Sequence, residues 1–154
     1  VHAGVTATDQ GLIEGRAAET LRARAALNAP VKILADLHVK HGRPLYAEDL
    51  VQAARDLVER AGADALVLSG ASTGSPTDPD ELERVREALP DATLLAGSGV
   101  TLRDVSRILA HADGVIVGTA LKRGGKTTAP VDRTRVRRFV SAARAASPRS
   151  RRSR

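Results

Sequence analysis

The sequence predicts an α/β protein in which parallel strands alternate with helices. Four short apolar runs are rich in Val, Ile and Leu and are nearly continuous, which is typical of strands buried on both faces. Helical patterns separate the runs at about 20 to 34 residues from strand to strand, the size of βαβ units. Two architectures fit this order: a doubly wound sheet, or part of a (β/α)8 TIM-type barrel, which needs about 250 residues when complete.

The apolar runs mark where the strands are expected. Residues 1–5 form the doubtful end of one further strand, so the chain holds four to five βα units. The four clear strands are expected at 31–37, 65–69, 93–96 and 114–117.

Helices are expected between the strands from apolar spacing and from end signals. Residues 47–61 carry one apolar stripe, and Gly62 follows as a stop. Asp78 and Pro79 are typical of an N-cap and a first helical residue, and that helix ends near residue 89. Further helices are expected at 9–28, after a Thr101 cap, and after an Asp132 cap.

The 154 residues carry a formal net charge of +6, but the basic residues are concentrated at one end. Nine arginines and no acidic residue lie between Arg133 and Arg154, whereas residues 1–132 contain every acidic residue. Nucleic acid is therefore not an expected partner. We expect a domain at 1–146 and a disordered basic tail at 147–154, for which peripheral contact with an anionic membrane is the alternative.

Cysteine is absent, which excludes disulfides and thiolate metal sites, and no apolar stretch is long enough to span a membrane. We expect a cytoplasmic protein, with a membrane-peripheral location as the alternative. The chain begins with Val1 and contains no Met, so we expect a fragment or a processed form of a longer protein.

Two glycine-containing loops form the clearest candidate site. Gly97, Ser98 and Gly99 follow the third clear strand, and Gly118 and Thr119 follow the fourth. Glycine lets backbone N–H groups approach an anion, and the loops after the last two strands of a barrel commonly bind phosphate. Glycine that merely makes each turn is the alternative. A phosphate at these loops would also meet Thr101 and the charge of Lys122.

A second cluster of ionisable residues leaves the strand at 31–37. Asp36, Lys40 and His41 are the catalytic candidates, as acid, base or imine-forming amine, and His38 is a candidate ligand contact. The alternative is a polar loop with ordinary ion pairs. No third metal ligand lies nearby, so neither a metal nor another cofactor is expected.

Weaker candidates lie in two other loops. Ser72 and Thr73 stand in a hydroxyl-rich loop that either contacts a ligand or simply connects two elements. Asp9 and Gln10 either face a ligand or belong to a helix cap at Thr8 or Asp9. We expect His2 and His111 to be structural.

Together these motifs resemble the BtpA/SgcQ family. The resemblance covers about residues 1–143 and rests on segments 8–11, 35–41, 62–65, 70–74, 97–100 and 113–119. It implies a TIM-type barrel of the ribulose-phosphate-binding kind, of which this chain is the C-terminal part. It also implies a phosphate site at Ser98, Gly99, Gly118 and Thr119. The founding cyanobacterial member is associated with photosystem I biogenesis at the membrane periphery.

Two functions follow from these observations. The first is binding of a phosphorylated small molecule by an isomerase or lyase, although the 154 residues alone are expected to lack part of the site. The second is a non-catalytic assembly factor that uses the barrel as a scaffold. Because a half-closed barrel leaves sheet edges and an apolar face uncovered, we also expect the 154 residues alone to be either marginally stable or homo-oligomeric.

Overall fold

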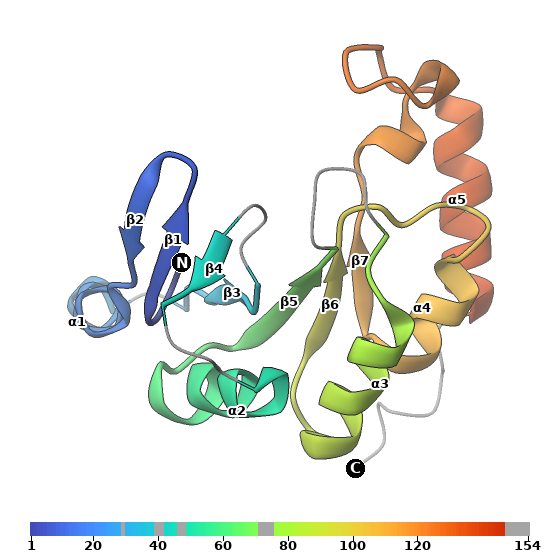
Figure 1. The fold of residues 1–154 in the computed structure, drawn as a ribbon. Coiled ribbons are helices and arrows are strands. Elements are labelled where there is room, and N and C mark those ends of the chain that lie inside the picture. The colour runs from blue at the N-terminus through green and yellow to red at the C-terminus, as the bar shows by residue number, and fades with distance from the viewer. Residues whose placement is uncertain (29, 39–41, 46–48, 71–75, 147–154) are drawn as a thin grey trace.

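The computed structural model describes residues 1–28, 30–38, 42–45, 49–70 and 76–146, which form two sheets and a layer of helices (Figure 1). The larger sheet is parallel and has the order β3-β5-β6-β7. Its strands are β3 (Leu34–Asp36), β5 (Ala65–Ser69), β6 (Leu94–Gly97) and β7 (Gly114–Ile116). All four clear strands of the sequence analysis are confirmed, with small changes at their ends.

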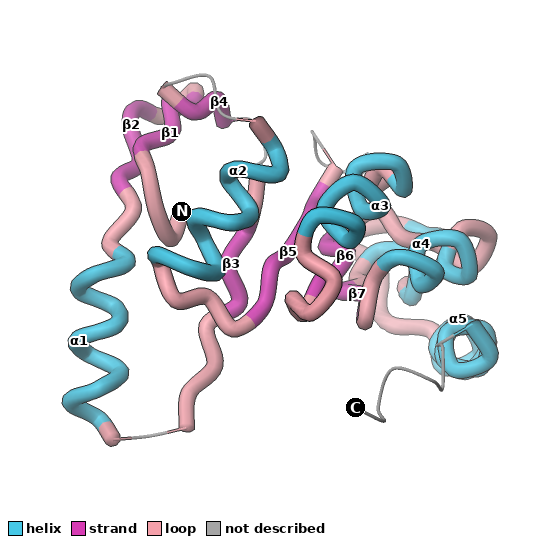
Figure 2. The backbone as a smooth tube through the Cα atoms, turned by 90° about the horizontal axis from the view of Figure 1, so that it is seen from below, coloured by secondary structure: helices cyan, strands magenta, loops and turns pink. Residues whose placement is uncertain are grey.

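Helices cover one face of the parallel sheet (Figure 2). Side chains that face them are among the most buried in the protein, including Leu66, Leu68 and Leu94 at 0–1% exposure. In the part of the chain that the structure describes, no helix covers the opposite face. A doubly wound sheet has helices on both faces, so the one-sided layer favours the barrel. The helices are α2 (Leu50–Arg55), α3 (Pro79–Ala88), α4 (Val105–His111) and α5 (Arg133–Ala146).

Aspartate side chains cap three of these helices. Asp49 accepts from the N–H groups of Val51 and Gln52 at the start of α2, which continues as a wide turn (Asp56–Arg60). The expected caps at Asp78 and Asp132 are confirmed by backbone N–H groups that donate to each carboxylate. The helix α4 itself begins at Val105, later than expected, but Thr101 caps the turn that leads into it. The Thr101 hydroxyl accepts the Arg103 N–H at 3.2 Å, the Thr101 N–H donates to Asp104, and the Thr101 carbonyl accepts the Val105 N–H at 3.1 Å.

The first 28 residues differ most from expectation. Instead of a parallel strand and one long helix, they form the hairpin β1 (Val5–Thr8) and β2 (Gly11–Glu14), followed by α1 (Ala17–Leu27). A further short strand, β4 (Gly42–Pro44), pairs with β1 on its other side. Thr8 makes the turn rather than a helix cap: its hydroxyl donates to the Gly11 carbonyl and accepts from the Gln10 N–H. Gly11 adopts φ +117°, which favours glycine.

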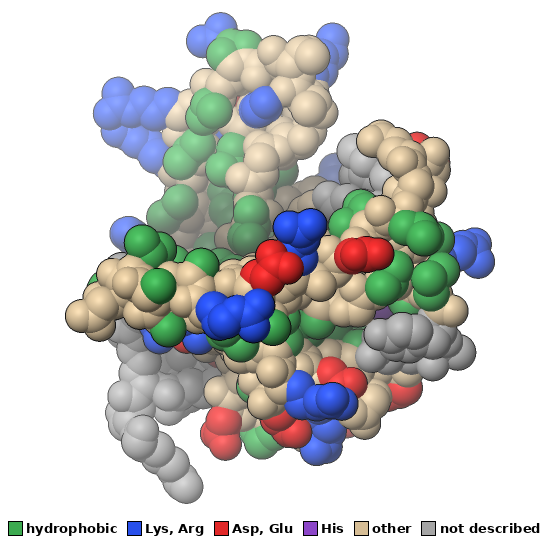
Figure 3. All heavy atoms as spheres, turned by 90° about the vertical axis from the view of Figure 1, so that its left-hand side faces the viewer, with side chains coloured by type: hydrophobic (Ala, Val, Ile, Leu, Met, Phe, Trp, Pro, Cys, Tyr) green, Lys and Arg blue, Asp and Glu red, His purple; other side chains and the backbone are tan. Residues whose placement is uncertain are grey.

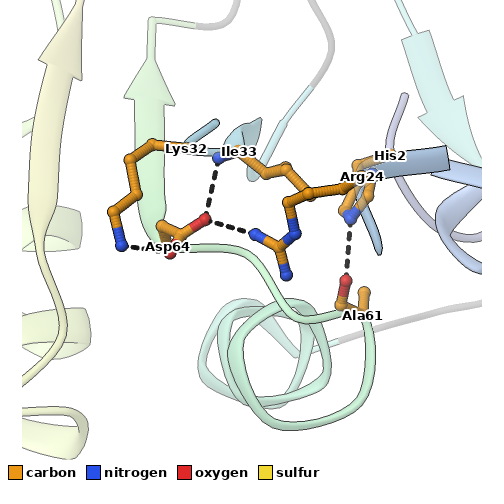
Figure 4. A network of polar contacts seen from close by, with 6 residues as sticks. All are labelled: His2, Arg24, Lys32, Ile33, Ala61 and Asp64. Atoms are coloured by element: carbon orange, nitrogen blue, oxygen red, sulfur yellow. Dashed lines mark hydrogen bonds and ion pairs between the residues drawn. The ribbon is translucent and has the colours of Figure 1, made fainter. Parts of the chain in front are cut away.

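Asp64 fastens the start of β5 to the start of β3 (Figure 4). Its carboxylate accepts the Ile33 N–H at 2.9 Å and pairs with Arg24 at 2.7 Å and Lys32 at 3.0 Å. These contacts, the Ile33 N–H first, hold the pKa of Asp64 below its ordinary value of 3.8. His2 lies beside this network and contacts the Ala61 carbonyl at 2.8 Å, in keeping with its expected structural role.

Asp113 makes the same kinds of contact at the start of β7. Its carboxylate accepts the Leu94 N–H at 2.8 Å and pairs with Arg86 at 2.5 Å. The Arg86 side chain is only 10% exposed and also donates to the carbonyls of Pro90, Ala92 and His111. Asp64 therefore links β3 to β5 and binds an arginine of α1. Asp113 likewise links β6 to β7 and binds an arginine of α3, and both lie at the end of the sheet where its strands begin.

The uncovered face of the sheet carries apolar side chains. Leu34 is 51% exposed and Ile116 is 49% exposed on this face. Hydrophobic groups are also visible on the side of the hairpin in Figure 3, among scattered charges. Other exposed large hydrophobics include Leu12, Leu27, Val31 and Leu45. The described chain is thus a partial barrel of four βα units with its inner face open.

Candidate functional site

A cavity of about 750 Å³ lies beyond the ends of β6 and β7, on the side where chemistry is placed in barrels. Both glycine-containing loops line it, so the structure brings Ser98, Gly99, Gly118 and Thr119 together. No Asp or Glu is among the lining residues. The remaining walls are Val100, Thr101, Leu102, Ile116, Ala120, Gly125, Thr127, Arg135, Arg138 and Phe139.

Ser98 has the most unusual backbone of the site. It adopts φ +77°, and Gly99 follows at φ +71°, so two consecutive residues are left-handed. Such a conformation is costly for serine and is held by its surroundings. The Ser98 N–H donates to the Ile116 carbonyl at 3.2 Å, and the buried Thr77 hydroxyl lies 3.2 Å from the Ser98 carbonyl.

The Ser98 hydroxyl is buried and has no hydrogen-bond partner among the described residues. Most buried hydroxyls are paired, so an orphan at a cavity wall indicates a missing partner. The same hydroxyl belongs to the loop that the sequence assigned to phosphate.

Gly97 serves packing rather than the cavity. It does not line the cavity, and a Cβ there would lie 2.6 Å from Val67 Cγ1 and 2.8 Å from Ser69 Oγ. Glycine is thus needed for the close contact of β6 with β5. Its expected part in phosphate binding stays a prediction.

The loop after β7 turns into a short 3-10 helix (Thr119–Leu121). The Thr119 hydroxyl lies 3.5 Å from that of Thr127 and is exposed at the cavity. Lys122 is turned elsewhere: it does not line the cavity, and its ammonium group donates to the Thr127 carbonyl. The positive charge of the cavity therefore comes from residues other than Lys122.

Arg135 and Arg138 are the cavity residues that sequence reasoning did not identify. They lie three positions apart on α5 and so share a helix face. The signal was present in the arginine-rich segment after Asp132, but the sequence alone did not show which of its arginines face the loops. Asp132 caps α5, and the N–H of Arg135, followed by that of Thr134, keeps its pKa below 3.8.

A second cavity of about 450 Å³ contains part of the other cluster. Asp36 and His38 line it, together with Asp56 and Arg60 from the helical segment that follows α2. The two cavities share no lining residue. In the described part of the chain, the structure thus joins Asp36 with His38 but separates both from the glycine-containing loops.

The other sequence candidates are placed as follows. Lys40, His41, Ser72 and Thr73 lie outside the described residues, as does the tail 147–154. Asp9 and Gln10 are exposed at the tip of the β1–β2 hairpin and line neither cavity. Figure 1 shows this tip on the same side of the molecule as the carboxyl ends of the parallel strands.

Two kinds of feature are absent from the described residues. They contain no group of three or more His, Cys, Asp or Glu side chains arranged to hold a metal ion. Among the helices that they form, none has the length and apolar character to cross a membrane. The absence of a cofactor and the cellular location both stay predictions.

Comparison with known proteins gives a consistent family signal. A model of the BtpA family matches residues 1–145. The chain is 45% identical over 139 residues to the photosystem I biogenesis protein BtpA of Synechocystis, covering 90% of this chain and 48% of that protein. It is 33% identical over 141 residues to the putative sgc region protein SgcQ of Escherichia coli, covering 91% and 53%. The chain thus spans about half the length of these curated relatives.

A solved structure described as "Native KDPGal structure" has the same fold. The TM-score is 0.52 with 21% identity, over 80% of this chain and 53% of that one. At this identity the likeness concerns the fold alone, and it agrees with a TIM-type barrel of which the four βα units form a part.

Proposed function

The chain belongs to the BtpA family, and we propose that it is the phosphate-binding part of a barrel protein that acts on a phosphorylated small molecule, as an isomerase or lyase. The observation that carries the proposal is the meeting of both glycine-containing loops at one cavity. Among the described residues, two arginines and no carboxylate line that cavity.

The phosphate would sit against the loop at 98–101 and the start of the turn at 118–121. Ser98 and Thr119 would donate their hydroxyls, and the backbone N–H groups of Gly99 and Gly118 would approach without interference from a side chain. The Ser98 hydroxyl supports this arrangement because it has no partner among the described residues, so a rotation of its side chain toward the cavity would let it donate to a phosphate oxygen without breaking another hydrogen bond.

The acid–base chemistry is assigned to the ionisable cluster that follows β3. Asp36 stands at the carboxyl end of a strand, where barrels carry catalytic groups, and His38 lines the same cavity as a proposed ligand contact. Lys40 and His41 complete the proposed set. A phosphate held at β6 and β7 would anchor the ligand while its other end extends across the sheet toward Asp36.

Isothermal titration of the 154-residue chain with inorganic phosphate tests the binding half of the proposal. Ser98→Trp and Thr119→Trp fill the cavity and should abolish binding. Thr128→Trp is the matched control, because Thr128 is exposed in the same segment and does not line the cavity. Equal binding by all four proteins, or no binding by the wild type, contradicts the proposal.

A second candidate function is a non-catalytic assembly factor. It is favoured by the 45% identity to a Synechocystis protein whose name refers to photosystem I biogenesis. In the full-length protein in its own host, this function predicts that Ser98→Trp and Lys40→Ala leave the amount of the assembled partner complex unchanged. Loss of that complex while the variant protein persists would count against it.

A further inference from the structure

We propose that Arg135 and Arg138 on α5 make the cavity selective for dianionic ligands, that is, for phosphate monoesters over monoanions of the same shape. The inference rests on the proposed function and identifies the residues that recognise the charge of the ligand. The loops supply neutral donors, and α5 supplies the cations.

Both arginines are held toward the cavity by the way α5 packs. Phe139 is 6% exposed and lines the same cavity, so the α5 face that carries it is turned inward. Arg138 precedes Phe139, and Arg135 lies one turn earlier. Arg137 and Arg144 are exposed on the same helix and do not line the cavity.

Arg135 makes one side-chain hydrogen bond within the protein and keeps further N–H donors for a ligand. Its guanidinium donates to the Ala120 carbonyl at 3.2 Å, which fixes it against the turn that follows Gly118. A guanidinium carries five N–H donors, so others remain for a ligand. The Arg138 guanidinium makes no hydrogen bond or ion pair with any residue that the structure describes.

The carboxylates nearby bond backbone N–H groups rather than forming an ion pair with a cavity guanidinium. Asp132 accepts from Thr134 and Arg135 and its charge also acts on Arg135, whereas Asp104 accepts from Thr101. Lys122 is engaged with a carbonyl. The segment between β7 and α5 is the highest part of Figure 3, and it shows basic groups with no acidic group on the visible face.

The cavity therefore presents two cations to its ligand. A phosphate monoester carries about −1.5 to −2 charges at neutral pH, which two guanidiniums balance, and its oxygens suit their forked geometry. Neutral N–H and O–H donors discriminate weakly between a dianion and a monoanion. Two arginines favour the dianion because the second negative charge gains a cationic partner.

Methyl phosphate and methyl sulfate test the inference, since they have the same shape and differ by one charge at pH 8. Titration of the 154-residue chain should show methyl phosphate binding at least about tenfold more tightly. Arg138→Ala should remove most of that preference, and Arg135→Ala should reduce it. Arg137→Ala is the control, because it removes the same charge from the same helix outside the cavity.

The outcomes separate the two proposals. If the wild type binds both probes equally, or if Arg138→Ala and Arg137→Ala behave alike while Ser98→Trp still abolishes binding, selectivity by α5 is overturned and the phosphate site stands. If the wild type binds neither probe, both proposals are overturned. Thermal melts that match the wild type establish that Arg138→Ala is folded.

Discussion

The backbone N–H of Ser98 donates to the carbonyl oxygen of Ile116 over 3.2 Å. This bond joins the first residue after β6 to the last residue of β7, so the two glycine-containing loops leave the sheet from one fixed point. It also holds Ser98 at φ +77°, where its hydroxyl is buried without a partner. The site thus carries a local cost that a bound anion would offset.

Ser98→Gly should raise the stability of the protein and lower its affinity for phosphate. Glycine tolerates φ +77° and removes the unpaired hydroxyl, so the free energy of unfolding should rise by about 1 kcal/mol. Phosphate affinity should fall because one donor is lost. Urea denaturation and phosphate titration of the same protein measure both effects. A less stable variant with unchanged affinity would show that Ser98 is merely structural.

Arg86→Met should destabilise the fold strongly. The substitution leaves three carbonyls and the Asp113 carboxylate without their buried partner, at a cost of about 3 kcal/mol. Arg84→Met on the same helix is the control. Arg84 pairs with Asp49 in solvent, with side chains 57% and 59% exposed, so its loss should cost less than about 1 kcal/mol. Similar losses for the two variants in urea denaturation would contradict the role given to Arg86.

Asp64→Asn should destabilise the protein in a pH-dependent way. The pKa of Asp64 is lowered in the folded protein, so its carboxylate stabilises the fold above the ordinary value of 3.8. That stabilisation is lost as the pH falls through the folded-state pKa. The melting temperatures of wild type and variant should therefore differ at pH 7 and converge as the pH falls well below 3.8. Asp91→Asn, at an exposed position, is the control and should leave the melting temperature at pH 7 unchanged.

Gly97→Ala should be destabilising because its Cβ would meet Val67 Cγ1 at 2.6 Å and Ser69 Oγ at 2.8 Å. Overpacking of this kind costs about 1–3 kcal/mol. Val67→Ala removes the closer of the two atoms, so the double variant should be more stable than the sum of the single effects predicts. Strict additivity in urea denaturation would mean that this contact does not explain the glycine.

The parallel part of the fold was predictable because each strand is a continuous apolar run. Helix caps such as Asp78 and Asp132 were predictable from side chains that bond their own helix. The β1–β2 hairpin was missed because its turn depends on Thr8 bonding and on the positive φ of Gly11, both of which also fit the entrance to a helix.

The candidate site was predictable only in part. Chain order placed both glycine-containing loops at one end of the sheet, and the structure joins them at one cavity. Local pattern did not show which α5 arginines face inward, since that depends on how Phe139 packs. It likewise did not show that Asp64 and Asp113 would each bind an arginine from a helix far along the chain.

The most direct test of the phosphate site is a titration of the ¹⁵N-labelled 154-residue chain with inorganic phosphate, followed by amide chemical shifts. The account predicts that the largest shifts fall on Ser98, Gly99, Gly118 and Thr119, whose loops meet at the cavity. Shifts confined to other parts of the chain, or no shifts at saturating phosphate, would contradict it.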